Sequence, residues 1–126
     1  MKKSLIILMV MIICSVAGLS NADTGWIYNP DNGHSYKRID TSMTWSDAKI
    51  YAENLGGYLA TITSQDENDF VWDNLGASGP DFIWLGGTDE VTEGTWQWVT
   101  GEAWVYENWG PGQPDDGGYG QDYLSF

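Results

Sequence analysis

The sequence predicts one α+β domain, in which two helices are combined with small antiparallel sheets. Three observations support this prediction. Two strand-like segments come first, and two segments with helix-capping signals follow them. Residues 88–126 then hold short strand-like runs separated by loops that are rich in glycine and proline. We find no internal repeat and no linker between these parts, so a second domain is not expected.

The first elements are a predicted hairpin and a helix. Residues 26–28 and 34–39 are typical of strands, and the turn-forming sequence Asn29–Gly33 lies between them. Thr44 is a favoured N-cap residue for a helix that carries apolar residues at helical spacing. The glycine pair at residues 56–57 supplies the end of this helix.

The remaining elements are a second helix and several strands. The capping box Ser64–Glu67 predicts a helix start, with Val71 and Leu75 on the inner face. A strand at 58–62 precedes this helix, and the apolar run Phe82–Leu85 predicts a buried strand after it. Further strands are expected at 96–99, 104–106 and 123–126.

Residues 1–22 predict a signal peptide rather than a part of the fold. Two lysines precede the apolar run Leu5–Ile13, and Ser20–Ala22 offers small residues to signal peptidase. The run is too short to span a bilayer comfortably. We therefore expect cleavage after Ala22. Residues 23–126 would be exported in soluble form, secreted, periplasmic or at the cell surface, with no membrane insertion after cleavage.

The composition excludes several partners. The chain has a net charge of −13, and loss of Lys2 and Lys3 with the signal leaves three cationic side chains against eighteen acids, or −15. Such a charge repels nucleic acid and anionic lipid. The single cysteine, Cys14, lies in the signal, so no disulfide is expected in the domain. Eight Trp, seven Tyr and three Phe are available to fill its core.

Oxygen donors are concentrated in residues 111–122. Proline and glycine prevent helix or strand in this loop. The donors are Gln113, Asp115, Asp116, Gln121 and Asp122. Ca²⁺ takes six to eight oxygen ligands and tolerates irregular geometry, so this composition suits it. A solvated acidic turn is the alternative interpretation of the same residues.

Five motifs occur in a defined order along the chain. They are Leu55–Ile62, Ser64–Asn68, Phe82–Gly86, Thr88–Trp96 and Asn108–Asp115. Together they resemble the C-type lectin-like domain family, and the resemblance covers about residues 26–126. It implies the C-type lectin-like fold, which has two helices, small antiparallel sheets and a long calcium-binding loop region.

The resemblance also implies two calcium sites. At the principal site, a cis proline would turn the oxygens of Gln113 and Asp115 toward one Ca²⁺, and Gln121 stands where a ligating glutamate is common. Gln113 and Asp115 would also bind the sugar hydroxyls. The auxiliary site would use four acids, Asp89, Glu93, Asp116 and Asp122. Turn capping is the alternative role for Asp89 and Glu93.

The Gln-Pro-Asp sequence resembles galactose-preferring members of the family. Those members stack an aromatic ring on the sugar, and Tyr119 is the nearest candidate for that role. An exposed loop tyrosine is the alternative. The resemblance places Trp96, Trp98 and Trp109 in the core, and His34 is expected on the surface, away from the loop.

Three departures from the family pattern stand out. Gln121 replaces a carboxylate with a neutral amide. The Trp-Asn-Asp motif, which normally supplies two calcium ligands and the final strand, is not found before Phe126, so we expect the domain to be incomplete at its C-terminus. Ala52 and Tyr123 stand where animal members have disulfide cysteines, and disulfide-free members occur among bacterial domains.

The sequence therefore predicts an exported calcium-dependent carbohydrate-binding module of the galactose type. The alternative is a C-type lectin-like protein-interaction or adhesion domain that binds an extracellular protein and no sugar. An enzyme is not expected, because His34 is the only histidine and no Ser/His/Asp or Cys/His set is present.

Overall fold

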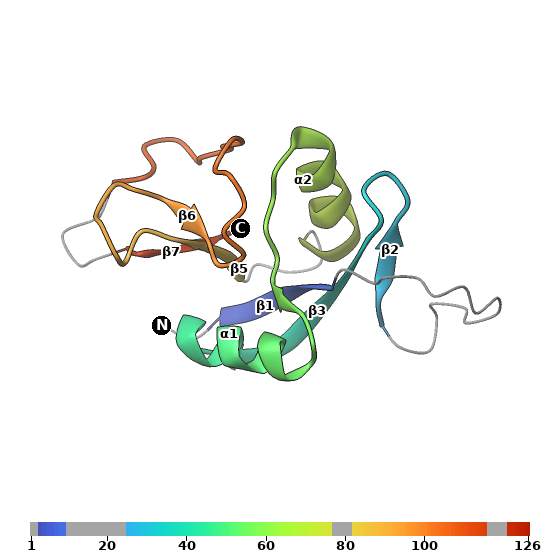
Figure 1. The fold of residues 1–126 in the computed structure, drawn as a ribbon. Helices are drawn as coiled ribbons and strands as arrows, with labels where there is room; N and C mark the ends of the chain where they lie inside the picture. The colour runs from blue at the N-terminus through green and yellow to red at the C-terminus, as the bar shows by residue number, and fades with distance from the viewer. Residues whose placement is uncertain (1–2, 10–24, 77–81, 116–120) are drawn as a thin grey trace.

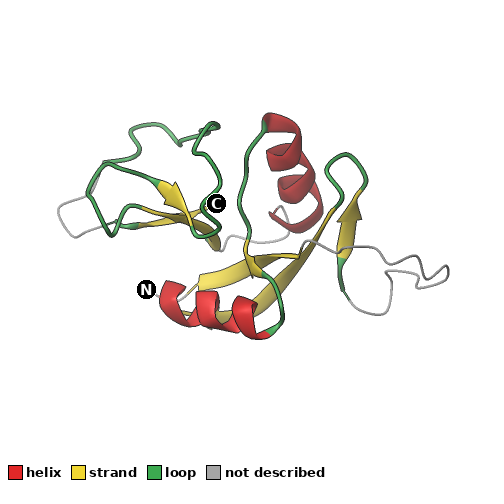
Figure 2. Cartoon of the chain, in the orientation of Figure 1, coloured by secondary structure: helices red, strands yellow, loops and turns green. Residues whose placement is uncertain are grey.

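The chain folds as an α+β structure with two helices (Figure 1), as the sequence predicts, and its strands form one mixed sheet in which most pairs are antiparallel. This computed structural model describes residues 3–9, 25–76, 82–115 and 121–126. Figure 2 separates helices, strands and loops in the same orientation. The strands are β1 (Lys3–Met9), β2 (Ile27–Asn29), β3 (His34–Met43), β4 (Tyr58–Leu59), β5 (Ile83–Thr88), β6 (Gln97–Trp98) and β7 (Tyr123–Ser125). The helices are α1 (Trp45–Asn54) and α2 (Gln65–Val71), the latter continued by a π-helical turn, Trp72–Gly76.

The sheet has the order β2-β3-β1-β5-β6, with β4 also paired to β1 and β7 to β5. The two helices cover opposite faces of it (Figure 1). Alternate residues of β5 divide between the two faces because side chains alternate along a strand. Ile83 and Leu85 pack in the cluster that holds Val71 and Leu75 of the α2 side. Trp84 packs with the residues that α1 buries, namely Trp45, Ala48 and Ala52.

Both helix starts form as the sequence predicts. The Thr44 hydroxyl accepts a hydrogen bond from the Asp47 amide at 3.2 Å, and the Ser64 hydroxyl accepts one from the Glu67 amide at 3.2 Å. These bonds satisfy amides that a helix leaves without an internal partner. Gly56 ends the first helix region with a φ of 81°, a conformation that favours glycine.

Two expected strands differ in the structure. β4 covers only Tyr58–Leu59 of the expected 58–62; beyond it, the Ala60 amide donates to the Ile6 carbonyl and the Ala60 carbonyl accepts from the Gly86 amide. No strand forms at 104–106. There the indole ring of Trp104 packs against other tryptophans and its N–H donates to Glu107 at 2.8 Å.

The structure places Lys3–Met9 inside the sheet, whereas the sequence assigns residues 1–22 to a signal peptide outside the fold. β1 is antiparallel to β3 over six residue pairs and parallel to β5. Ile6 has no exposed surface. A continuous apolar run satisfies both a signal sequence and a strand that is buried on both faces, so periodicity does not distinguish them. Cleavage after Ala22 stays a prediction.

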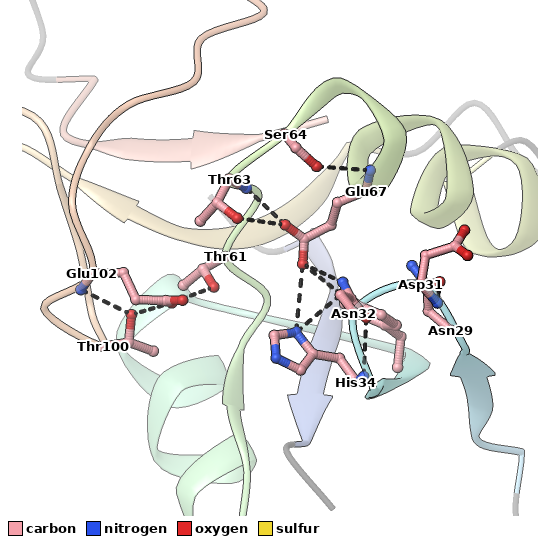
Figure 3. A network of polar contacts seen from close by, with 11 residues as sticks. Asn29, Asp31, Asn32, His34, Thr61, Thr63, Ser64, Glu67, Thr100 and Glu102 are labelled. Atoms are coloured by element: carbon pink, nitrogen blue, oxygen red, sulfur yellow. Dashed lines mark hydrogen bonds and ion pairs between the residues drawn. The ribbon is translucent and has the colours of Figure 1, made fainter.

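A buried carboxylate joins the β2–β3 hairpin to the start of α2 (Figure 3). The side chain of Glu67 is 4% exposed and accepts hydrogen bonds from the Tyr36 hydroxyl at 2.5 Å and the Asn32 amide at 3.1 Å. Its other oxygen accepts from the backbone and hydroxyl of Thr63 at 2.8 and 3.0 Å. His34 lies 3.6 Å away. The burial of this carboxylate is compensated because both oxygens are hydrogen-bonded.

Replacing Glu67 with alanine is expected to lower the free energy of unfolding by about 3 kcal/mol, because the buried Tyr36 hydroxyl and the Thr63 amide lose their acceptor. Urea unfolding followed by tryptophan fluorescence measures this loss. Glu53→Ala is the matched control, since Glu53 is 54% exposed and pairs with Lys49 at 3.8 Å, an arrangement that contributes little to stability. Equal losses in the two variants would mean that the network does not stabilise the fold.

Tyr36 should make the fold sensitive to alkaline pH. Burial, followed by the hydrogen bond and charge of Glu67, raises the pKa of Tyr36 above its ordinary value of 10.0. The unfolded chain loses this proton near that value while the folded chain keeps it. The stabilisation is therefore complete below a pH of about 10 and decreases as pH rises beyond it. We expect the urea midpoint to fall less steeply in Tyr36→Phe than in the parent chain across this range; parallel profiles would contradict the assignment.

Candidate functional site

The long loop between β5 and β7 is closed at its base. Thr88 at the end of β5 pairs with Tyr123 at the start of β7, and the Asp89 amide donates to the Asp122 carbonyl at 3.2 Å. Asp89 and Asp122 are therefore neighbours although the whole loop separates them in the sequence. Tyr123 fixes this end, because its ring stacks on Trp45 at 4.6 Å between centroids.

A tight turn brings Glu93 back over Asp89. The Asp89 carbonyl accepts from the Thr92 amide at 3.0 Å, and one carboxylate oxygen, Oδ2, accepts from the Gly94 amide at 2.9 Å. Gly94 has a φ of 75°, which a residue with a side chain rarely adopts. The turn therefore depends on glycine at this position, and it places the Glu93 carboxylate beside Asp89.

Three carboxylates converge at the base of the loop. Each of Asp89, Glu93 and Asp122 offers an oxygen, and these oxygens lie within 4.8 Å of one another. Asp89 is 3% exposed, and its second oxygen, Oδ1, has no hydrogen-bond partner among the described residues. A buried carboxylate oxygen without a partner is costly, and three like charges at this separation repel. The arrangement is chemically suited to a cation.

Gln113 and Asp115 form a second group of oxygen donors on the loop. The peptide bond between Gln113 and Pro114 is cis, and both side chains are exposed. The Gln113 amide donates to Asp115 Oδ1 at 3.1 Å, so the two side chains point toward one another. The family resemblance implies this cis bond, and the structure contains it.

The remaining predicted site residues fall into two groups. Gln121 is exposed and directly precedes Asp122. Asp116 and Tyr119 lie outside the described residues, so their predicted roles stay predictions. His34 is where the sequence predicts it, on the hairpin, and its ring nitrogen Nδ1 contacts the Glu67 network rather than the loop.

Both groups of donors line one cleft of about 1170 Å³. The acidic cluster and the Gln113–Asp115 segment form part of its wall. Aromatic rings form much of the rest, contributed by Trp45, Trp72, Phe82, Trp84, Trp96, Trp98, Trp104, Tyr106, Trp109, Tyr123 and Phe126. A cleft with apolar rings and a few convergent polar groups is the usual form of a small-molecule site.

Four tryptophans form a cluster along this cleft. Trp104 lies at its centre, with ring centroids 4.4 Å from Trp98, 5.8 Å from Trp96 and 6.1 Å from Trp109. Trp98 is buried, as the resemblance implies, whereas Trp96 and Trp109 are only half-buried. The buried indole N–H groups of Trp96 and Trp98 have no acceptor among the described residues. The sequence analysis assigned Trp104 no role in the site. The high density of tryptophans between residues 96 and 109 is the sequence feature that indicates this cluster.

Residues 41–122 match the family model described as the lectin C-type domain. The chain belongs to the C-type lectin domain family. The match includes both groups of oxygen donors described above. The matched relatives are lectin domains rather than enzymes.

Two known proteins are similar in sequence to this chain. Human C-type lectin domain family 10 member A is 32% identical over 113 residues, which is 82% of this chain and 34% of that protein. Halomucin of Haloquadratum walsbyi is 41% identical over 80 residues, which is 60% of this chain and 1% of that protein. This C-type lectin domain therefore spans about a third of the human relative and a very small part of halomucin.

A solved structure shares the fold. The carbohydrate-recognition domain of cow CD23, crystallised in the presence of a GlcNAc2Man3 oligosaccharide, matches with a TM-score of 0.72 and 30% identity. The match covers 81% of this C-type lectin domain and 75% of the cow chain.

The described residues include no helix with the length and apolar character needed to cross a membrane.

Proposed function

We propose that this domain binds carbohydrate in a calcium-dependent manner. The observation that supports the proposal best is the cluster of Asp89, Glu93 and Asp122, in which Asp89 Oδ1 is buried and has no hydrogen-bond partner among the residues that the structure describes. Ca²⁺ is a hard cation that takes carboxylate oxygens, so it fits this donor set. Bound there, it would neutralise the repulsion between the three carboxylates and hold the two ends of the long loop together.

We further propose that Gln113 and Asp115 bind a second Ca²⁺ and the sugar itself, with Gln121 as a neutral third donor. All three residues line the cleft. Hydrogen bonds from sugar hydroxyls to the charged Asp115 would be the stronger ones. The Gln-Pro-Asp sequence favours galactose-type sugars, and aromatic rings of the cleft, together with Tyr119, can cover the apolar face of such a sugar.

A second candidate function is protein binding without sugar. Two observations favour it. Gln113 and Asp115 already hydrogen-bond to each other, and the amide of Gln121 brings no negative charge to a cation. In both cases the proposed location is outside the cytoplasm, because residues 1–22 have the features of an export signal.

Calcium should raise the thermal stability of the full chain. A ligand that binds only the folded state adds about 2.7 kcal/mol when its free concentration is a hundred times the Kd, which raises Tm by several degrees. Differential scanning calorimetry in millimolar Ca²⁺ and in chelator measures this rise. Asp89→Asn should remove most of it, since the amide oxygen keeps the bond from Gly94 but lacks the charge.

The matched control for Asp89→Asn is Glu53→Gln, which removes one charge on α1. Its calcium-dependent rise should equal that of the parent chain. A parent chain that melts at the same temperature with and without calcium would contradict the calcium site. An equal rise in Asp89→Asn would place the ion elsewhere.

Galactose-agarose should retain the full chain in calcium and release it in chelator. Asp115→Asn should reduce the retained fraction at least about tenfold, because a charge-assisted hydrogen bond to the sugar is lost. Asp31→Asn, on the β2–β3 turn, is the control for charge and should be retained like the parent. Failure of the parent to bind galactose, mannose and glucose resins would favour the protein-binding candidate.

A further inference from the structure

Part of the long loop runs beside the segment that leads from β4 into the first turn of α2. The Thr61 hydroxyl donates to Glu102 Oε2 at 2.7 Å, and the Tyr106 hydroxyl donates to Gln65 Oε1 at 3.0 Å. Each pair is 41 residues apart in the sequence, so the two stretches follow one another in step and in the same direction. We call these two hydrogen bonds the loop clamp, and Figure 3 shows its Glu102 end.

The loop stretch between the two bonds is also held in its middle. It forms neither helix nor strand, although its side chains alternate as in an extended chain. Glu102 and Tyr106 reach the body of the domain, whereas Val105 is 73% exposed. The ring of Trp104, between the two clamp residues, packs on the buried ring of Trp98 at 4.4 Å between centroids. The stretch is therefore fixed at both ends and at its centre.

The surface that receives the clamp is itself well ordered by hydrogen bonds. Thr61 is 1% exposed, and Thr63 donates two hydrogen bonds to the buried Glu67 carboxylate (Figure 3). On the exposed side of α2, Gln65 Nε2 donates to Asp69 Oδ1 at 2.7 Å. This bond orients the Gln65 amide, so its oxygen is presented to the loop before any ligand binds.

A short path joins the clamp to the Gln-Pro-Asp sequence. Three residues after Tyr106, the ring of Trp109 packs on that of Trp96 at 4.9 Å between centroids. The Gln113 amide then donates to the Gly110 carbonyl at 3.0 Å and closes a turn. The position of this turn depends on where the preceding loop stretch is held.

We propose that the loop clamp positions Gln113 and Asp115 for sugar binding, with Glu102 and Tyr106 as positioning residues. A loop that has to be ordered when its ligand binds loses conformational entropy at that moment, and this lowers affinity. The clamp removes part of this cost because it orders the loop beforehand. The inference rests on the proposed sugar binding, and it adds two residues outside the donor groups on which affinity depends.

The test compares variants of the full chain that lose one end of the clamp, Glu102→Ala and Tyr106→Phe, with the conservative variant Glu102→Gln. Glutamine keeps a side-chain oxygen that accepts from Thr61. Hydrogen–deuterium exchange in chelator measures the order of the loop. We expect the amides of residues 103–113 to exchange at least about threefold faster in Glu102→Ala and Tyr106→Phe, because a net hydrogen bond no longer opposes local opening. Glu102→Gln should exchange like the parent chain.

The second readout is affinity for galactose-agarose in calcium. Loss of either clamp residue should weaken it about three- to tenfold, the usual effect of one net hydrogen bond, and Glu102→Gln should restore it. The calcium-dependent rise in Tm should remain in all three variants, because Asp89 and Asp122 are fixed by β5 and β7. A residue that only stabilised the fold would instead raise exchange throughout the domain.

The controls are Asp31→Ala on the β2–β3 turn and Tyr51→Phe, whose ring is 40% exposed on α1. Both should match the parent chain in both readouts. Unchanged loop exchange in Glu102→Ala and Tyr106→Phe would overturn the proposal, as would faster exchange spread over α1 and the sheet. Weaker galactose binding without faster loop exchange would make the two residues direct sugar contacts. A parent chain that binds no sugar would contradict the proposed function, whereas exchange in chelator still decides whether the clamp orders the loop.

Discussion

The structure depends on a close backbone approach at Gly86, in the middle of β5. A Cβ atom at this position would lie 2.7 Å from the carbonyl oxygen of Leu59, so no other residue fits without displacement. The Gly86 amide donates to Ala60 at 2.8 Å, and its carbonyl accepts from Val99 at 2.8 Å. One residue without a side chain therefore holds the segment after β4 and the strand region of β6 against β5. Every residue of β5 is buried.

The candidate site is a consequence of where β5 ends. Asp89 follows its last residue, so the rigid strand fixes the position of the buried carboxylate of the acidic cluster. Asp122 is fixed from the other side by β7 and the stacking of Tyr123 on Trp45. Glu93, Gln113 and Asp115 lie on loop turns and are exposed. The acidic cluster thus combines two donors set by the sheet with one set by a turn, whereas the Gln113–Asp115 pair lies wholly on the loop.

Local signals explain how much of the fold the sequence predicts. The caps at Thr44 and Ser64 follow from hydroxyl groups at the right spacing, and the inner position of Val71 follows from helical periodicity. The meeting of Asp89 and Asp122 depends on pairing between distant strands, which no local pattern encodes, so only the family resemblance supplied it. Lys3–Met9 was not expected in the sheet, because an apolar run is compatible with export and with burial alike. The expected strand around Trp104 does not form. Its ring packs against another tryptophan instead, and local β-propensity does not predict such a tertiary contact.

The tryptophan cluster gives the protein a built-in optical reporter. Four of its eight tryptophans, Trp96, Trp98, Trp104 and Trp109, form one cluster along the cleft with neighbouring ring centroids 4.4 to 6.1 Å apart. Transition dipoles at such separations couple, so the geometry of these four rings contributes to the near-ultraviolet dichroism of the chain. Any molecule that enters the cleft changes that geometry or the polarity around it. Occupancy can therefore be followed in the unlabelled protein, and loop rearrangement can be distinguished from global unfolding by its spectral shape.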